Sequence, residues 1–162
     1  MEIHMMRSYL VTVVLLSASG LDLVSASDAL HVISDLGSGR ATAYRTGNRI
    51  VTSGDHIHVV WQDAVDDTFY ARVRTYNRVT REWSPATTIG LGEDNHGGPV
   101  IAADSQGYLH TVFYPHNGTF HYRRSTSSND SSQWGQEQTF AGRNTYPSLL
   151  VELDDSLILA SR

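Results

Sequence analysis

Two histidines have the residue type and the setting to move protons. The chain has eight histidines. His96 lies in segment 93–98 and His116 in segment 115–119, and both segments are rich in Asn, Gly and Pro, the residues of turns and loops. Because histidine exchanges a proton close to neutral pH, His96 and His116 are candidates for proton transfer or ligand binding.

A second histidine pair has a simpler interpretation. His56 and His58 alternate in a strand-like segment, so they would share one face and could chelate a metal. Two ligands are too few to define a metal site, and no metal or other cofactor is predicted. His58 also has a counterpart, His110, at the same place in a repeat, which favours a packing role for both.

The elements that must position these histidines are β-strands arranged in a repeat. Segments rich in β-branched and aromatic residues alternate with turns from residue 49 onward. The repeat has a period of about 51 residues and about four strands, which is typical of a β-propeller blade. The alternative is a β-sandwich with a coincidental repeat. The equivalent pairs are His58 and His110, Trp61 and Phe113, Phe69 and Phe120, Arg72 and Arg123, and Trp83 and Trp134.

The blade interpretation brings His96 and His116 to one rim. In an antiparallel meander, the link into strand one and the turn between strands two and three lie at the same end. His96 falls in the first of these connections of its blade and His116 in the second. The equivalent positions of the preceding blade lie near Tyr44 and Ala64, so the pair is not duplicated and is a better functional candidate than His58 and His110.

The charge and the cysteine content of the chain exclude several classes of function. All 12 basic residues are arginine, against 17 acidic residues, and the net charge of -5 argues against nucleic acid as a main partner. The absence of cysteine excludes disulfides, cysteine-based zinc sites and thiol chemistry.

The N-terminus has the pattern of an export signal. Arg7 precedes an apolar stretch at 9–16, and Val24 and Ala26 form a small-residue cleavage site. The apolar stretch is too short to span a bilayer as a helix, so no stable membrane span is expected after cleavage. We predict a signal peptide at 1–26 and a secreted or periplasmic protein from residue 27.

The predicted fold is all-β: a partial propeller after the signal peptide. The blades cover about 43–92 and 93–142, with an incomplete third blade at 143–162, or about two and a half four-stranded blades. Because propellers usually need about four to eight blades to close, this chain is expected to be the N-terminal part of a longer propeller. The remaining blades would then be its partners.

The segments around the two histidines resemble the BNR-4-type repeat family, which includes the propeller ulvan lyases. The resemblance rests on 94–100, 104–110, 114–117 and 121–125, with shorter pieces at 43–45 and 145–147, and covers roughly residues 40–162. It implies a seven-bladed parent that cleaves an acidic, uronate-containing polysaccharide by β-elimination.

The resemblance also implies roles for individual residues. β-Elimination needs a cation for the uronate carboxylate, a base for the C5 proton and an acid for the leaving oxygen. His96 becomes the candidate base, and His116 a substrate-positioning or proton-transfer partner. Asn95 and Asn117 would hydrogen-bond sugar hydroxyls. Weaker candidates from the next loop of the same rim are Arg143, Asn144 and Tyr146.

Two departures from the family pattern bear on activity. Ser161 and Arg162 stand where the family lyases often carry a Tyr-Arg pair, and the carboxylate-neutralising arginine would come from further along the chain. The chain alone is therefore expected to be inactive.

The alternatives to a lyase are a non-catalytic carbohydrate-binding or interaction propeller and, less favoured, a sialidase-like glycosidase. For the latter, segment 104–108 lacks the spacing and the tryptophan of an Asp-box.

Overall fold

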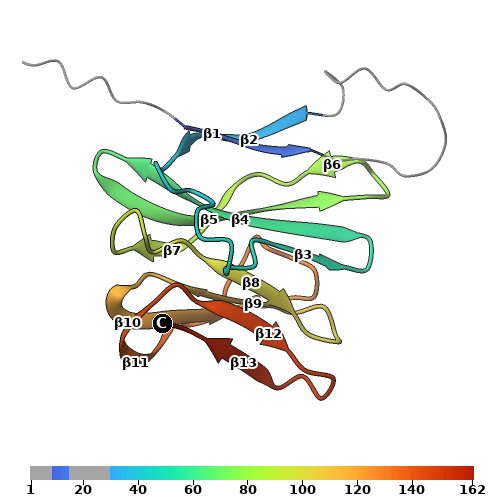
Figure 1. Ribbon diagram of the computed structural model, residues 1–162. Helices are drawn as coiled ribbons and strands as arrows, with labels where there is room; N and C mark the ends of the chain where they lie inside the picture. The colour runs from blue at the N-terminus through green and yellow to red at the C-terminus, as the bar shows by residue number, and fades with distance from the viewer. Residues whose placement is uncertain (1–8, 15–29) are drawn as a thin grey trace, which may run out of the picture.

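The computed structural model describes residues 9–14 and 30–162, and these residues form β-strands and no helix (Figure 1). The first sheet has seven strands: β1 (Tyr9–Val14), β2 (Leu30–Gly37), β3 (Ile50–Ser53), β4 (His56–Val65), β5 (Thr68–Asn77), β6 (Glu82–Trp83) and β7 (Thr87–Gly92). The second has four: β8 (Val100–Ala103), β9 (Leu109–Phe113), β10 (His116–Arg124) and β11 (Gln138–Thr145). The third is the hairpin β12 (Ser148–Val151) and β13 (Leu157–Ala160).

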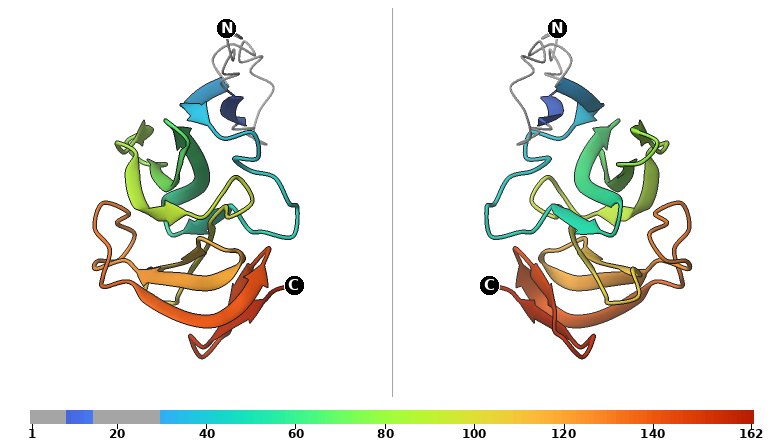
Figure 2. Two further views of the ribbon diagram at one scale, coloured as in Figure 1. Left: turned by 90° about the vertical axis from the view of Figure 1, so that its left-hand side faces the viewer. Right: turned by 90° about the vertical axis from the view of Figure 1, so that its right-hand side faces the viewer.

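The sheets are successive propeller blades. Antiparallel pairing runs from β3 through β4 and β5 to β7 in the first, and from β8 through β9 and β10 to β11 in the second. Figure 2 shows the sheets following one another from the N-terminal to the C-terminal end. Two four-stranded blades and the first hairpin of a third make a partial β-propeller, as the repeat predicts.

Asn48 links the first strands of all three blades. Its side-chain amide donates to the carbonyls of Ile101 on β8 and of Leu149 on β12, the latter at 2.9 Å. Its side-chain oxygen accepts from the Leu149 backbone N–H at 3.0 Å. Through these bonds one side chain of the first blade satisfies backbone groups of the second and third blades, which ties the three blades together.

The core lies between the blades, and this explains the burial pattern of the strands. β9 is buried along its whole length because neighbouring blades cover both of its faces. β4 is buried continuously from His58 to Asp63, because the next blade covers one face and Ile33 and Ala41 cover the other. Phe113 of β9 fills the space beside Gly90 of β7, where an added Cβ would lie 2.3 Å from the phenyl ring. A small residue at Gly90 is therefore what lets the two blades pack closely.

His58 and His110 are structural, as the repeat predicts. His58 is fully buried, and its Nδ1 lies 2.7 Å from the Thr75 hydroxyl. His110 is 6% exposed and lies between Asp104, 3.3 Å from its Nε2, and the Tyr122 hydroxyl, 2.8 Å from its Nδ1. Both rings are components of the blade interior.

Acid is expected to destabilise the fold through His58. Burial, with a smaller contribution from the nearby His56, lowers the pKa of His58 from 6.5 to about 4. In the unfolded chain the ring takes up a proton below about pH 6.5, while the folded chain keeps it neutral to about pH 4, so stability falls across this window by about 3 kcal/mol. Urea denaturation between pH 7.5 and 4 measures the loss. In His58→Gln this part of the pH dependence disappears. If the free energy of unfolding fell equally steeply with pH in His58→Gln and in the parent chain, His58 would not be the group responsible.

The N-terminal strands bear on the predicted signal peptide. β1 contains most of the apolar stretch and pairs antiparallel with β2, which in turn pairs with β4 at Gly37 and Asp63. Residues 1–8 and 15–29, which include the predicted cleavage site after Ala26, lie outside the described residues. Within the described ranges, no helix is long and apolar enough to cross a membrane.

Candidate active site

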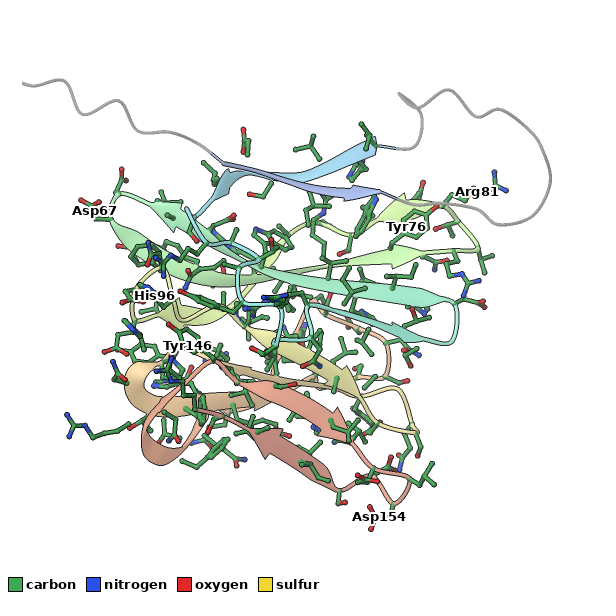
Figure 3. The ribbon with its side chains drawn as sticks, in the orientation of Figure 1. Asp67, Tyr76, Arg81, His96, Tyr146 and Asp154 are labelled. Carbon is green, nitrogen blue, oxygen red and sulfur yellow. The ribbon has the colours of Figure 1, made fainter. Side chains whose placement is uncertain are left out.

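Two connections meet at one rim and place His96 against His116. His96 lies in the link from β7 to β8, and His116 begins β10 after the turn from β9. The imidazole rings stack with centroids 4.1 Å apart and planes 20° apart. Figure 3 shows His96 on the same side of the molecule as Tyr146 and Asp67, and Tyr76 and Arg81 on the other. The meander geometry thus brings together two residues that are distant in sequence.

Hydrogen bonds and a close backbone approach hold the two connections together. The Glu93 N–H donates to the Tyr114 carbonyl at 2.9 Å, and the His116 N–H donates to the Glu93 carboxylate at 2.7 Å. At Gly97 an added Cβ would lie 2.1 Å from the Tyr114 carbonyl oxygen. Only glycine fits there, because backbone rather than a movable side chain occupies the space.

Asp94 joins the two histidines. Its Oδ1 accepts from the His96 backbone N–H at 2.6 Å and lies 3.2 Å from His96 Nδ1, while its Oδ2 lies 2.6 Å from His116 Nδ1. Burial raises the pKa of Asp94, but the hydrogen bonds from the His96 backbone and the His116 ring outweigh this, and the pKa falls below its usual value. An ionised carboxylate only accepts hydrogen bonds, so Asp94 favours a proton on the Nδ1 atom of each ring that faces it.

Two tyrosines complete the cluster. The rings of Tyr44 and Tyr146 are 4.1 Å apart, Tyr44 lies 5.9 Å from the His96 ring and Tyr146 lies 6.4 Å from the His116 ring. Burial raises the pKa of Tyr44, and so does its hydrogen bond with Tyr146, whereas Arg40 lowers it. The exposed Arg40 donates to the Tyr44 hydroxyl and so brings a guanidinium to the edge of the cluster.

The backbone around the cluster adopts conformations that are rare for residues with a side chain. φ is +69° at Tyr44, +90° at Tyr114, +69° at Asn117 and +54° at Tyr146. Such conformations cost about 1–3 kcal/mol each and persist where the surroundings impose them, often at functional sites. At this rim they show that the surrounding contacts impose the loop conformation beside the histidine pair.

The structure places the other site residues predicted from the sequence at different distances from the histidine pair. Tyr146 lies in the cluster. Arg143 and Asn144 were expected in a loop but belong to the end of β11, because Asn144 pairs with Gly118 of β10. Arg143 is exposed. The Asn144 amide donates to Gly142 and its oxygen accepts from Ser161, so this side chain is engaged outside the histidine pair.

Asn95 and Asn117 make no side-chain hydrogen bond within the described part of the chain, and Asn117 is exposed. Sequence reasoning missed Asp94, Arg40 and Tyr44 as members of the cluster. The spacing Asp-x-His was a usable signal for Asp94, since an aspartate readily accepts from the backbone N–H two residues ahead. Tyr44 could have been found from the repeat, where it occupies the position equivalent to His96.

The same cluster has the composition of a metal site. One ligand atom from each of Asp94, His96 and His116 lies within 4.8 Å of the others. No metal is predicted from the sequence, because only the His56 and His58 pair shows a chelating pattern there.

Gly97→Ala is expected to disrupt the site and destabilise the fold. The new methyl group would meet the Tyr114 carbonyl, and forcing the two connections apart should cost about 1–3 kcal/mol in the free energy of unfolding. Gly142→Ala, on the same rim with no atom within 4 Å of its added Cβ, should change stability by less than about 0.5 kcal/mol. Urea denaturation of the two variants tests this, and equal stability would contradict the close approach.

Fold and site together define a propeller segment with a histidine–carboxylate cluster on one rim. The chain belongs to the BNR repeat-containing family, whose model matches residues 64–162. It is similar to the ulvan lyase of Nonlabens ulvanivorans, with 31% identity over 108 residues that cover 60% of this chain and 22% of the relative. It is also similar to the ulvan lyase of Alteromonas sp. (strain LOR), with 35% identity over 71 residues, 38% of this chain and 14% of the relative.

Solved structures show the same fold. A PL25 ulvan lyase matches with a TM-score of 0.69 and 21% identity over 78% of this chain and 34% of its own. A second structure of such a lyase, bound to a glucuronic acid–rhamnose-3-sulfate repeat, matches with a TM-score of 0.69 and 20% identity over the same shares. The chain thus spans about a fifth or less of the length of these curated relatives and a third of the solved chains.

Proposed function

We propose that this chain supplies the proton-transfer site of an exported lyase that cleaves a uronate-containing polysaccharide by β-elimination. The observation that carries the proposal is the His96–Asp94–His116 cluster, in which two stacked imidazole rings both contact one carboxylate through Nδ1 at one rim of the propeller. The similarity to two ulvan lyases supports an acidic polysaccharide as substrate.

The geometry distinguishes the two histidines. Asp94 lies 2.6 Å from His116 but 3.2 Å from His96, so it stabilises an imidazolium better at His116. Neutral His96 takes the C5 proton of the uronate through Nε2, and the electron pair of that C–H bond forms the C4=C5 double bond. The C4–O4 bond then breaks, and O4 receives the Nε2 proton of His116, which acts as an imidazolium beside Asp94 and is left as the neutral ring protonated on Nδ1.

The uronate carboxylate needs a cation, because its negative charge otherwise opposes removal of the C5 proton. Arg40 brings one exposed guanidinium to the tyrosine edge of the cluster. We infer that the remaining positive charge comes from blades that follow in the parent propeller. The chain alone should therefore bind an acidic polysaccharide but turn it over poorly.

Export is part of the same proposal, since a polymer of this kind lies outside the cell that degrades it. We expect the signal peptide to be removed after Ala26, so that the mature protein begins at Ser27. Mass spectrometry of the protein recovered from an expressing bacterial culture measures the N-terminus. Recovery of the intact chain inside the cells alone would contradict this prediction.

The activity test uses two proteins. One is the 162-residue chain, and the other is a chimaera in which the matching segment of the Nonlabens ulvanivorans ulvan lyase is replaced by this chain's residues. Both are incubated with ulvan, and the absorbance of the unsaturated uronate product is followed. We expect polymer binding by the chain and product formation by the chimaera.

A folded chimaera that binds ulvan without forming product would overturn the lyase proposal in favour of a carbohydrate-binding propeller. Circular dichroism and thermal unfolding establish that the chimaera is folded. A matched chimaera carrying His56→Ala controls for changes unrelated to the site. His56 is the first residue of β4 and is not part of the histidine–carboxylate cluster, so this chimaera should keep full activity.

A further inference from the structure

We propose that Asp94, His96 and His116 form a binding site for a divalent transition-metal ion, best suited to Zn²⁺, which competes with their use in proton transfer. The three ligand atoms come from two connections that the backbone already holds together, and they lie within 4.8 Å of one another.

The distances are close to those of a tetrahedral metal site. With bonds of about 2.0–2.2 Å to nitrogen and oxygen, two ligand atoms of a tetrahedral Zn²⁺ lie about 3.3 Å apart. His96 Nδ1 and Asp94 Oδ1 are already 3.2 Å apart. His116 Nδ1 lies 2.6 Å from the other carboxylate oxygen, Oδ2, which is a hydrogen-bond distance, so His116 must move outward for its Nδ1 to bind the metal.

Access to the site allows this movement. The side chain of His116 is 30% exposed, that of His96 is 21% exposed and that of Asp94 is 38% exposed. A metal can therefore reach the three ligands from solvent without opening the blade core, and solvent can supply the fourth ligand of an open site.

The ligand types select the class of metal. Two imidazoles and one carboxylate suit Zn²⁺, Co²⁺ or Ni²⁺, whereas Ca²⁺ and Mg²⁺ prefer sites made of oxygen ligands. Both rings contact Asp94 through Nδ1, so a metal held by these atoms would replace the two ring–carboxylate hydrogen bonds. The site should therefore discriminate between Zn²⁺ and Mg²⁺.

A bound metal would change what the histidines can do. In the metal-free site, the Asp94 oxygens face Nδ1 of both rings, and the proposed proton transfer uses Nε2. A metal on Nδ1 prevents this, because a neutral imidazole bound through Nδ1 carries its proton on Nε2. If the proposed function holds, Zn²⁺ should inhibit the lyase, since Nε2 of His96 could no longer accept a proton.

Isothermal titration calorimetry of the tag-free 162-residue chain with Zn²⁺ tests the site directly. We expect one ion per chain with a dissociation constant on the order of micromolar, and no heat of binding with Mg²⁺. His96→Ala and His116→Ala should each weaken Zn²⁺ binding at least about tenfold. The matched control His56→Ala removes one member of the other histidine pair and should bind like the parent chain.

The outcomes separate this proposal from the lyase proposal. Failure to bind Zn²⁺, or binding that is lost in His56→Ala and kept in His96→Ala, would overturn the metal site whatever the activity. Thermal unfolding shows that each variant is folded. Tight Zn²⁺ binding by a protein without lyase activity would support the metal site and remove the lyase function, and inhibition of an active chimaera by Zn²⁺ would support both.

Discussion

His96→Ala in the chimaeric lyase is expected to lower kcat for ulvan by about a thousandfold, with little change in KM. The imidazole supplies the only lone pair assigned to the C5 proton, and alanine cannot replace it. Because the ring is part of a loop and 21% of its side chain is exposed, its removal leaves the blade core intact. Initial rates of product absorbance over a range of ulvan concentrations give kcat and KM separately.

The companion variant His116→Ala tests the division of roles. The proposal assigns proton delivery to His116, so its loss should reduce kcat less than loss of His96 when the leaving oxygen can take a proton from water. A larger effect at His116 would exchange the two assignments. Unchanged turnover in His96→Ala would remove this histidine from the chemistry, and the double variant would then show whether either ring takes part.

The blade repeat and the rim pairing could be predicted from the sequence because both follow from periodic constraints. Strands alternate in direction, so connections separated by two strands return to the same end whatever their side chains are. His96 and His116 occupy two such connections and lie 4.1 Å apart. The duplicated His58 and His110 likewise follow the period and are buried.

The contacts within the rim could not be predicted in the same way. Asp94 reaches both histidines only because the two connections approach closely at Gly97, and no repeat period encodes that approach. Asn144 was expected to face the site, yet its hydrogen bonds are to Gly142 and Ser161. Loop side chains take their direction from local φ values and neighbouring backbone, which the alternation of polar and apolar residues does not specify.

The N-terminal apolar stretch fits two different predictions from the sequence. A short run of β-branched and aliphatic residues suits both a signal peptide and a strand, since both require apolar residues without charge. β1 pairs with β2 over this stretch, while the cleavage motif lies outside the described residues. Pattern alone does not distinguish a segment that pairs in the full chain from one that is removed on export.

Asp94→Asn is expected to lower kcat of the chimaera by about a hundredfold while the protein stays folded. The amide has nearly the shape of the carboxylate but carries no charge, and its NH₂ group can only donate. One histidine would lose its acceptor, and the imidazolium at His116 would lose the charge 2.6 Å away. The effect should fall on kcat rather than KM, because Asp94 orients the rings and is not proposed to contact the sugar.

The matched variant is Asp104→Asn, because Asp104 also contacts a histidine, at 3.3 Å from His110 Nε2, but in the blade interior. It should lower the free energy of unfolding and leave kcat nearly unchanged in the folded chimaera. Nitrogen NMR shifts of His96 and His116 provide a further readout, since loss of the Asp94 charge should move the proton from Nδ1 toward Nε2 in at least one ring. Parent-like kcat and unchanged ring shifts in Asp94→Asn would show that the carboxylate does not set the state of the histidines, and the base would then depend on its position alone.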